Sequence, residues 1–441
     1  MIGATDPLFA DPFGLPEVGV VLLKVFVAFV FLLVAVMFNI WFLRKVISDM
    51  QNRIGPNLAG PWGILVTLAD GIKLFFKEDL IPEKSHRFVF KLAPYLSLIP
   101  AFLVFAIVPI GGDFNRVDGP PEPGVISIFG HETLLQVADP PVGILFFLAM
   151  SSLAIYGVML AGWGSGSKYP LLGSVRASAQ MVSYEAALGL SIASVVLVSG
   201  TLSMHDMVLT QAGPGFNSFV PNWNIIVTGF IPFFIFLVAG TAELNHPPFD
   251  LVEAEQELVG GFHTEYSSIR FALFYLAEFM NQITMGAIIV TLFLGGPAGP
   301  ALFVPKGWWV GVFWFFFKLM LFLFGFVWLR ATLPRLRYDQ LMDLGWKLLI
   351  PVSLAWFLVL AGIQIGRDRG WSSVEVGAFA LGFGVVCMLC GALLMMALSS
   401  ARAQRLTDLE QASADSGQAS ADLGQKRADL GETPTKGVLR G

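Results

Sequence analysis

A group of acidic side chains in the middle of the chain has the residue types needed for proton transfer. The segment ELNHPPFDLVEAEQELVGGFHTEY, residues 243–266, holds six carboxylates within 24 positions, and the first basic residue after it is Arg270. Carboxyl groups crowded together without cations share protons near neutral pH and respond to a new charge nearby. The segment is therefore a candidate proton-coupling site, and its acids are Glu243, Asp250, Glu253, Glu255, Glu257 and Glu265.

A structural interpretation of part of this segment stays open. Asp250 and Glu253 have the spacing of a helix capping box, and Pro247-Pro248 would fix the entry of the chain into that helix. Glu257, which follows Glu253 by one helical turn, would then face water. This interpretation assigns the three acids to helix stability and not to proton transfer.

Two further acids, Glu185 and Glu278, lie inside strongly apolar runs of the sequence. A charged side chain inside a bilayer costs about 2.5–3.5 kcal/mol, and such residues usually line proton or substrate paths. With a rise of about 1.5 Å per helical residue, both acids lie about 10 Å below the membrane surface, near the level where Glu243 ends another apolar run. We expect the carboxyl groups of these three segments to lie in one shallow layer.

The elements that carry these acids are predicted to be transmembrane helices. The chain has 441 residues, of which 55% are hydrophobic and 13% are charged, and its mean hydropathy is +0.71. Soluble domains carry about 25% charged residues, and a globular core of this size could not bury 40 Phe and 11 Trp side chains. The composition therefore predicts an all-α, polytopic membrane protein. Two cysteines are too few for a disulfide framework or for a zinc or iron–sulfur site.

Nine apolar runs have the length and the low charge of membrane-spanning helices. They cover residues 18–42, 93–110, 142–162, 178–199, 224–242, 271–294, 307–329, 347–365 and 374–399. Proline lacks the N–H that an interior helical position donates, so kinks are expected at Pro100 and Pro232.

The basic residues predict the orientation of these spans. With the N-terminus outside, the cytoplasmic loops and tail hold 21 Lys and Arg residues, and the opposite side holds four. This bias predicts a multi-pass protein of the cell membrane with a cytoplasmic C-terminus and with the acidic segment on the cytoplasmic side. Residues 1–399 would form the membrane domain. Residues 400–441, rich in Ala, Asp, Gln, Ser and Gly, are predicted to form a disordered tail.

Three smaller features complete the predicted topology. In the first cytoplasmic loop, residues 62–76 place apolar side chains at helical spacing, which predicts an amphipathic helix on the membrane surface. Lys318 lies in the middle of the seventh run, and we expect it to face the bundle interior near an acid. Lys24 lies near the outer end of the first run and is predicted to extend toward the interface.

Several classes of cofactor are disfavoured by motifs that the sequence lacks. It contains no G-x-G-x-x-G fingerprint and no H-E-x-x-H, and GWGSGSKY at residues 162–169 does not match a phosphate-binding loop. Cys387 and Cys390 form C-x-x-C in the last run without a second pair, which favours a packing role. We therefore expect no metal site, no redox centre in this chain and no nucleic-acid partner.

Five segments resemble the membrane-embedded H subunit family of proton-translocating NADH:quinone oxidoreductase, respiratory complex I, to which mitochondrial NADH dehydrogenase subunit 1 also belongs. They are RKVISDMQNRIGPNLAGPWG (44–63), LADGIKLFFKED (68–79), SGSKYPLLGSVRASAQMVSYE (165–185), AELNHPPFDLVEAEQELVGGFHTEYSSIRFALFYLAEF (242–279) and WLRATLPRLRYDQLMDLGWK (328–347). The resemblance implies a quinone tunnel that opens to the lipid near the first and sixth helices and the surface helix. It also implies a funnel of acids that joins this tunnel to a proton-pumping membrane arm.

The resemblance implies roles for individual residues through these motifs. The implied proton-coupling residues are Glu185, Glu243, Asp250, Glu253, Glu255, Glu257 and Glu278, with Asp70, Lys73 and Glu78 in the surface-helix motif. The implied tunnel residues are Arg44, Arg53, Phe249, Phe262, Arg335 and Arg337. The substrate would be ubiquinone or menaquinone. NADH, FMN and iron–sulfur clusters would be bound by partner subunits, which would include peripheral quinone-site subunits and small membrane-arm subunits.

The chain departs from the family pattern at two positions. Leu43 stands where an acid often precedes the Arg-Lys pair, and His246 stands where many relatives have Arg. Two other functions stay open: the homologous subunit of a membrane-bound hydrogenase-type complex, and an ion transporter that works alone. Such a transporter typically has paired internal repeats with broken midplane helices, and the two halves of this sequence lack that self-similarity.

Overall fold

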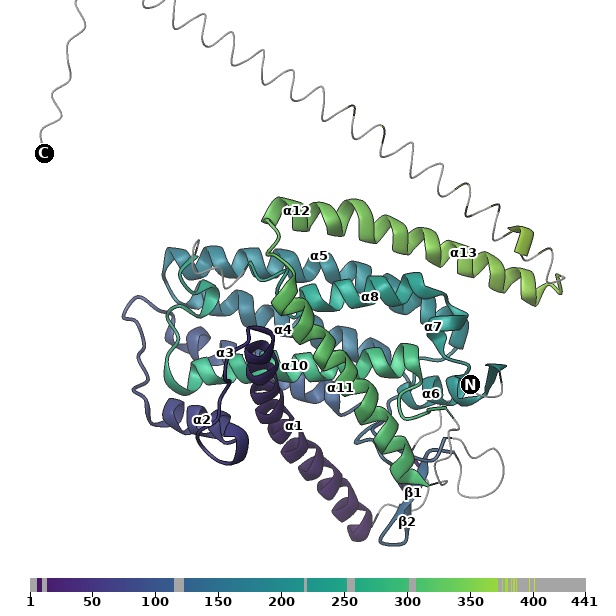
Figure 1. The fold of residues 1–441 in the computed structure, drawn as a ribbon, viewed down its shortest axis with the longest axis horizontal. Helices are drawn as coiled ribbons and strands as arrows, with labels where there is room; N and C mark the ends of the chain where they lie inside the picture. The colour runs from purple at the N-terminus through teal and green to yellow at the C-terminus, as the bar shows by residue number, and fades with distance from the viewer. Residues whose placement is uncertain are drawn as a thin grey trace, which may run out of the picture. The chain divides into compact units, whose positions relative to one another are not determined.

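The computed structural model describes residues 6–9, 14–114, 123–217, 220–251, 258–300 and 307–371, with scattered positions between 375 and 400. This described part is mostly helical, with two small antiparallel ribbons, which confirms the all-α class (Figure 1). Residues Met1–Gln364 form one unit and residues Ile365–Gly441 form another. The division into a membrane domain, 1–399, and a tail, 400–441, stays a prediction, because the tail lies outside the described residues almost completely.

Seven helices in the described residues are long and apolar enough to cross a membrane. They are α1 (Leu15–Met50), α3 (Arg87–Phe105), α4 (Gly143–Gly164), α5 (Lys168–Ser199), α10 (Ser268–Leu294), α11 (Trp308–Thr332) and the continuous stretch of α12 (Tyr338–Asp343), a π-helical turn (Leu344–Leu349) and α13 (Ile350–Asp368). A further apolar helix, α8 (Phe230–Glu243), is shorter. The chain is therefore a polytopic membrane protein. The ninth predicted span, 374–399, lies almost entirely outside the described residues.

The fifth predicted span, 224–242, is divided into two helices. Residues Asn224–Val227 form the short helix α7, and α8 begins after Gly229, whose φ of 81° is unfavourable for a residue with a side chain. Pro232 lies in the first turn of α8, where a missing N–H leaves no helical hydrogen bond unmade. The expected kink at Pro232 is therefore wrong, and the break lies at Gly229. Pro100 lies inside α3 as expected.

Helix α5 begins well before the predicted span 178–199. Ser167 is extended, with φ −119° and ψ 151°, and the helix starts at Lys168 with Pro170 in its first turn. Proline is tolerated there, so the helix can start before the apolar run. With 32 residues α5 is longer than a bilayer requires, and Glu185 lies near its middle and not near its start.

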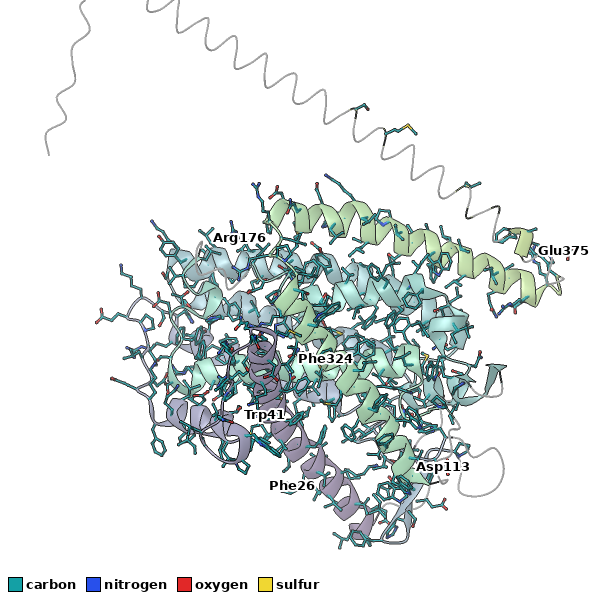
Figure 2. The ribbon with its side chains drawn as sticks, viewed as in Figure 1. Phe26, Trp41, Asp113, Arg176, Phe324 and Glu375 are labelled. Atoms are coloured by element: carbon teal, nitrogen blue, oxygen red, sulfur yellow. The ribbon has the colours of Figure 1, made fainter. Side chains whose placement is uncertain are left out.

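Helix α10 forms the centre of the described bundle. It packs against α1, α3 and α11 (Figure 1), and 83% of its most apolar stretch is buried inside the protein, compared with 22% for α1. Side chains of α1 such as Phe26 are exposed instead (Figure 2). The protein therefore has a fully packed central helix and a peripheral first helix whose apolar surface needs lipid or another subunit to cover it.

The predicted surface segment contains the helix α2 (Val66–Phe76), none of whose residues is buried. Trp41 of α1 donates its indole N–H to the carbonyl oxygen of Trp62 at 3.0 Å (Figure 2). Ser268, at the start of α10, donates its hydroxyl to the carbonyl oxygen of Leu74 at 3.0 Å. These bonds hold the α2 segment against α1 and α10, at the end of the bundle that is called the α2 end below.

The two ribbons and a short helix lie at the other end of α10. Strand β1 (Val125–Ile128) pairs with β2 (His131–Leu134), and β3 (Pro214–Asn217) pairs with β4 (Val220–Pro221). Between the ribbons in the chain is α6 (Met204–Ala212), where Gln211 donates to the carbonyl oxygen of Thr291 in the last turn of α10, at 2.9 Å. This part of the bundle is called the hairpin end.

Both lysines of the predicted spans lie at the hairpin end, Lys318 buried and Lys24 half-buried. Lys24 Nζ donates to Asp6 Oδ2 at 2.8 Å and to Thr133 Oγ1 at 2.7 Å, and its extension toward the interface stays a prediction. Lys318 faces the interior as expected, but its partners are not acids. Its Nζ donates to the carbonyl oxygens of Leu294, Gly296 and Ala298, at 2.6, 2.9 and 2.5 Å. The last carbonyls of a helix have no helical partner and carry partial negative charge, so they can hold an ammonium group.

Candidate functional site: acids of three helices beside an apolar cavity

Three helices bring carboxyl groups together inside the bundle. Glu185 comes from α5, Glu243 from the last residue of α8, and Glu278 from α10. Glu185 and Glu243 are close enough to interact electrostatically, and Glu243 and Glu278 line the same cavity. The structure thus brings together the three acids that the sequence places in one layer, although α5 starts earlier than predicted.

Two adjacent serines of α4 hold two of these acids. Ser151 Oγ donates a hydrogen bond to Oε1 of Glu243, and Ser152 Oγ donates to Oε1 of Glu185. Successive residues of a helix point about 100° apart, so one turn of α4 reaches acids on two neighbouring helices. A hydroxyl group can donate or accept, and these serines can therefore hold the carboxyl groups in both protonation states. The second oxygen of Glu243 is buried and has no hydrogen-bond partner among the described residues.

The cavity beside the acids is partly open to the surroundings and spans about 650 Å³ of empty space, and its wall is mostly apolar. A neighbouring cavity of about 410 Å³ is lined by some of the same residues, Glu243 among them. Aromatic side chains form much of the wall of the larger cavity: Phe262, Phe271, Phe274 and Tyr275. An apolar space with a few polar groups at its wall is the usual form of a site for a small, largely apolar ligand.

Glu278 has a histidine as a close partner. His246 Nδ1, in the loop after α8, lies 3.3 Å from Glu278 Oε1. Burial, together with the charge of Arg330, lowers the pKa of His246 to about 3. The imidazole is therefore neutral at pH 7, and it lies within hydrogen-bond distance of the carboxyl group without neutralising a carboxylate charge.

One acid of the predicted group, Asp250, has a cationic partner. Arg335 Nη2 lies 2.8 Å from Asp250 Oδ2, and the two side chains are 39% and 8% exposed. The expectation that this acidic segment lacks basic partners is therefore wrong for Asp250, because the partner belongs to a loop far along the chain. Burial lowers the pKa of the nearby His263, which lines the cavity, to about 4, and Asp250 opposes this shift.

Both predicted tunnel phenylalanines are buried close to the cavity. Phe262 lines it, and the ring of Phe249 lies against Tyr184 with a centroid distance of 5.6 Å. Gln180 Nε2 donates to the carbonyl oxygens of Ala242 and Phe249, at 2.7 and 3.0 Å. This amide fixes the turn that carries the chain from Glu243 toward Asp250.

The remaining described members of the predicted set do not line the cavity. Asp70 forms ion pairs with Arg44 at 2.9 Å and with Lys73 at 3.4 Å. The other three described members of the set are exposed; they are Arg53, Glu78 and Arg337. Three predicted coupling acids lie outside the described residues, and with them the predicted capping box; they are Glu253, Glu255 and Glu257.

The sequence analysis missed the serines that hold the acids. Ser151 and Ser152 are adjacent hydroxyl residues inside an otherwise apolar run, LFFLAMSSLAIYG at 145–157, and this was the available signal. It also missed Arg335 as the partner of Asp250, for which the sequence offers no local signal. Among the described residues, no three His, Cys, Asp or Glu side chains are grouped so that they could hold a metal ion.

These features define a class: a polytopic membrane protein that holds acids from several helices beside an apolar interior cavity. The sequence family described as NADH dehydrogenase matches residues 23–361, and the chain belongs to this family. Its relatives include proteins named as the H subunit of NADH-quinone oxidoreductase. Two are from Frankia alni, 48% identical over 408 residues with 91% of this chain and 83% of the relative covered, and from Frankia casuarinae, 48% identical over 419 residues with 93% and 86% covered. A third, from Streptomyces avermitilis, is 46% identical over 383 residues, with 86% and 80% covered.

Proposed function

We propose that this chain is the quinone-tunnel component, the H subunit, of a proton-translocating NADH:quinone oxidoreductase. In this proposal acids of its helix bundle couple the reduction of quinone to proton pumping. The names of its relatives support the assignment to the complex. The coupling role rests on two observations: Glu185 of α5 lies within electrostatic range of Glu243 of α8, and Glu243 and Glu278 of α10 line one apolar cavity.

The substrate would be ubiquinone or menaquinone, whose reduction to the quinol takes up two electrons and two protons. The electrons would come from NADH through FMN and iron–sulfur clusters in partner subunits, and the other partners would be small membrane-arm subunits and the lipid bilayer. The aromatic wall at Phe262, Phe271 and Phe274 suits the flat quinone ring. This chain would contribute the path and the proton chemistry, and no redox centre.

The acids would sense the charge that the reaction changes. Proton uptake by the quinone removes positive charge from its surroundings, and coupled carboxyl groups in a low-dielectric site redistribute their protons in response. Ser151 and Ser152 hold Glu243 and Glu185 on one side of the cavity, and these hydroxyl groups can pass a proton between carboxyl groups. The proposal also assigns a coupling role to the acids at 253, 255 and 257, which lie outside the described residues, and it has the N-terminus outside and the C-terminus cytoplasmic.

Substitution of the acids in the assembled complex tests the coupling. Glu185→Gln, Glu243→Gln and Glu278→Gln each keep the side-chain shape and remove the exchangeable proton. We expect proton pumping to fall by about 10²-fold or more, within the range of about 10²–10⁴ that one acid–base group contributes. Glu132→Gln, in the exposed part of β2, is the control, and it should keep both quinone reduction and proton pumping. Unchanged quinone reduction and unchanged pumping in all three variants would remove the proposed coupling role.

Isolation in a mild detergent separates the proposal from its two alternatives. We expect flavin-containing and iron–sulfur subunits that oxidise NADH to copurify with the chain. Recovery with hydrogenase subunits would assign it to a hydrogenase-type complex instead. A chain that is stable and moves ions without peripheral redox subunits would be a transporter that works alone.

A further inference from the structure

A row of buried polar side chains leads from the acid cavity to the seam between α1 and α10. His246 Nδ1 lies 3.3 Å from Glu278 Oε1, and Gln282 of α10 lies beside His246. Asn39 Nδ2, on α1, donates to Gln282 Oε1 at 2.9 Å. The exposed fractions of Asn39, Gln282 and His246 are 0%, 1% and 4%. Burial of an amide or an imidazole is costly unless the group is hydrogen-bonded, so three of them in one row are not a by-product of packing.

We propose that His246 is a positioning residue for Glu278, which holds the Glu278 carboxyl group at the cavity wall and links its protonation to the seam between α1 and α10. This inference rests on the proposed function, because Glu278 is one of the coupling acids. It adds a neutral residue to that set, and it adds a route by which helix α1, at the edge of the bundle, can respond to the state of the cavity.

In the part of the chain that the structure describes, the charged groups that face His246 are Glu278 of α10 and Arg330 of α11. Helix α1 contributes a neutral amide only indirectly, through Gln282. On the segment of His246 itself, Glu243 accepts from a serine and Asp250 pairs with an arginine. Arg330 opposes a positive charge on the imidazole, so His246 acts on Glu278 through a hydrogen bond and not as a cation.

A neutral imidazole can follow the protonation of Glu278 without becoming charged. When Glu278 is ionised, Nδ1–H donates to the carboxylate and Nε2 has a free lone pair. When the pair takes up one proton, the carboxyl O–H donates to Nδ1, and the imidazole hydrogen lies on Nε2. Nε2 is buried and has no hydrogen-bond partner among the described residues. In this proposal the change of Nε2 from acceptor to donor alters the electrostatic field at the neighbouring amide of Gln282, which would respond by reorienting.

The test is the pH dependence of coupling in the assembled complex in sealed vesicles. The quantity measured is the number of protons pumped per electron from pH 6 to pH 9, together with KM for the quinone. His246→Leu removes the donor to the carboxylate, which is the stronger of the two hydrogen bonds, and so favours protonated Glu278. We expect the pH midpoint of pumping to rise by about one unit with little change in KM. His246→Gln, which can donate or accept, is expected to return the midpoint close to that of the unmodified protein.

His205→Leu is the matched control, because His205 is also 4% exposed but lies beside Phe114 at the hairpin end. The inference is overturned if His246→Leu assembles and leaves the midpoint unchanged, or if it changes the midpoint equally when Glu278 is already Gln. Should His246→Leu fail to assemble, Gln282→Met takes its place and must shift the midpoint in the same direction. A Glu278→Gln variant with full pumping would instead contradict the proposed function itself.

Discussion

The hairpin end of the bundle and the cavity hold charged side chains in different ways. At the hairpin end, Lys24 pairs with Asp6, and Lys318 is enclosed by three backbone carbonyl groups. At the cavity, Glu243 is held by a serine hydroxyl, and Glu278 contacts a neutral imidazole. The first arrangement holds each ammonium group with an acid or with backbone carbonyl groups, whereas the second holds carboxyl groups with neutral side chains.

This difference shows how one protein can use buried charge for stability and for chemistry. An ion pair in the interior contributes to stability only while both partners are present, because either charge alone would be buried without compensation. Hydroxyl and imidazole groups can donate or accept, and a carboxyl group held by them can gain or lose a proton in place. The ion pair at the hairpin end therefore suits a rigid support. The hydroxyl contacts at the cavity suit a site that exchanges protons.

The largest effect is expected from breaking the ion pair at the hairpin end. Lys24→Met leaves Asp6 buried without its cation, which costs about 3–5 kcal/mol of unfolding free energy for a pair of this kind. Thermal or denaturant unfolding in detergent measures the loss. The double variant Lys24→Met with Asp6→Leu should recover most of it, since an apolar pair needs no compensation.

The surface pair of Lys347 and Asp343 provides the control for this prediction. Their side chains are 52% and 60% exposed, and Lys347→Met should change the stability by less than about 1 kcal/mol. If Lys24→Met has the same free energy of unfolding as the unmodified protein, the Lys24–Asp6 pair does not stabilise the fold. The contrast between the hairpin end and the cavity is then lost.

A smaller effect is expected at Asp139, before α4. Burial raises its pKa from 3.8 to about 6, although Ser203 and Gln136 donate hydrogen bonds to it. Because the folded state binds this proton more tightly, the carboxyl group favours folding below about pH 4, and this contribution is lost as the pH rises to about 6. Between pH 4 and pH 7 the unmodified protein should lose about 2 kcal/mol relative to Asp139→Asn. If the free energy of unfolding changes with pH in the same way in the two proteins, the raised pKa of Asp139 is contradicted.

The smallest effect is expected at the serines of the cavity. Ser151→Ala and Ser152→Ala each remove a hydrogen bond to a carboxyl group, worth about 1.5 kcal/mol, and should lower proton pumping roughly tenfold. Ser151→Thr keeps the hydroxyl group and should keep most of the activity. Ser194→Ala is the control, because the Ser194 hydroxyl donates to the carbonyl oxygen of Leu190 in its own helix. Equal pumping in Ser151→Ala, Ser152→Ala and this control would show that the serines do not support the acids.

The membrane class and most of the helices could be predicted from hydropathy alone, because a run of about 20 apolar residues has few alternatives to a membrane helix. The boundaries were less predictable. Helix α5 starts at Lys168, before its apolar run, and Gly229 divides the fifth predicted span. Tertiary packing can extend a helix beyond its apolar part, and one glycine can end a helix within an apolar run, so hydropathy reports neither event.

By itself, the sequence determined that several acids lie inside apolar runs. A charged side chain there is costly, so their presence already indicated an interior polar site. The tertiary structure decided what each acid contacts. Glu243 is held by Ser151, 92 residues away in the chain, and Asp250 by Arg335, 85 residues away. Contacts of this range depend on how helices pack, and hydrogen bonds act over about 3 Å only, so no local pattern in the chain encodes them.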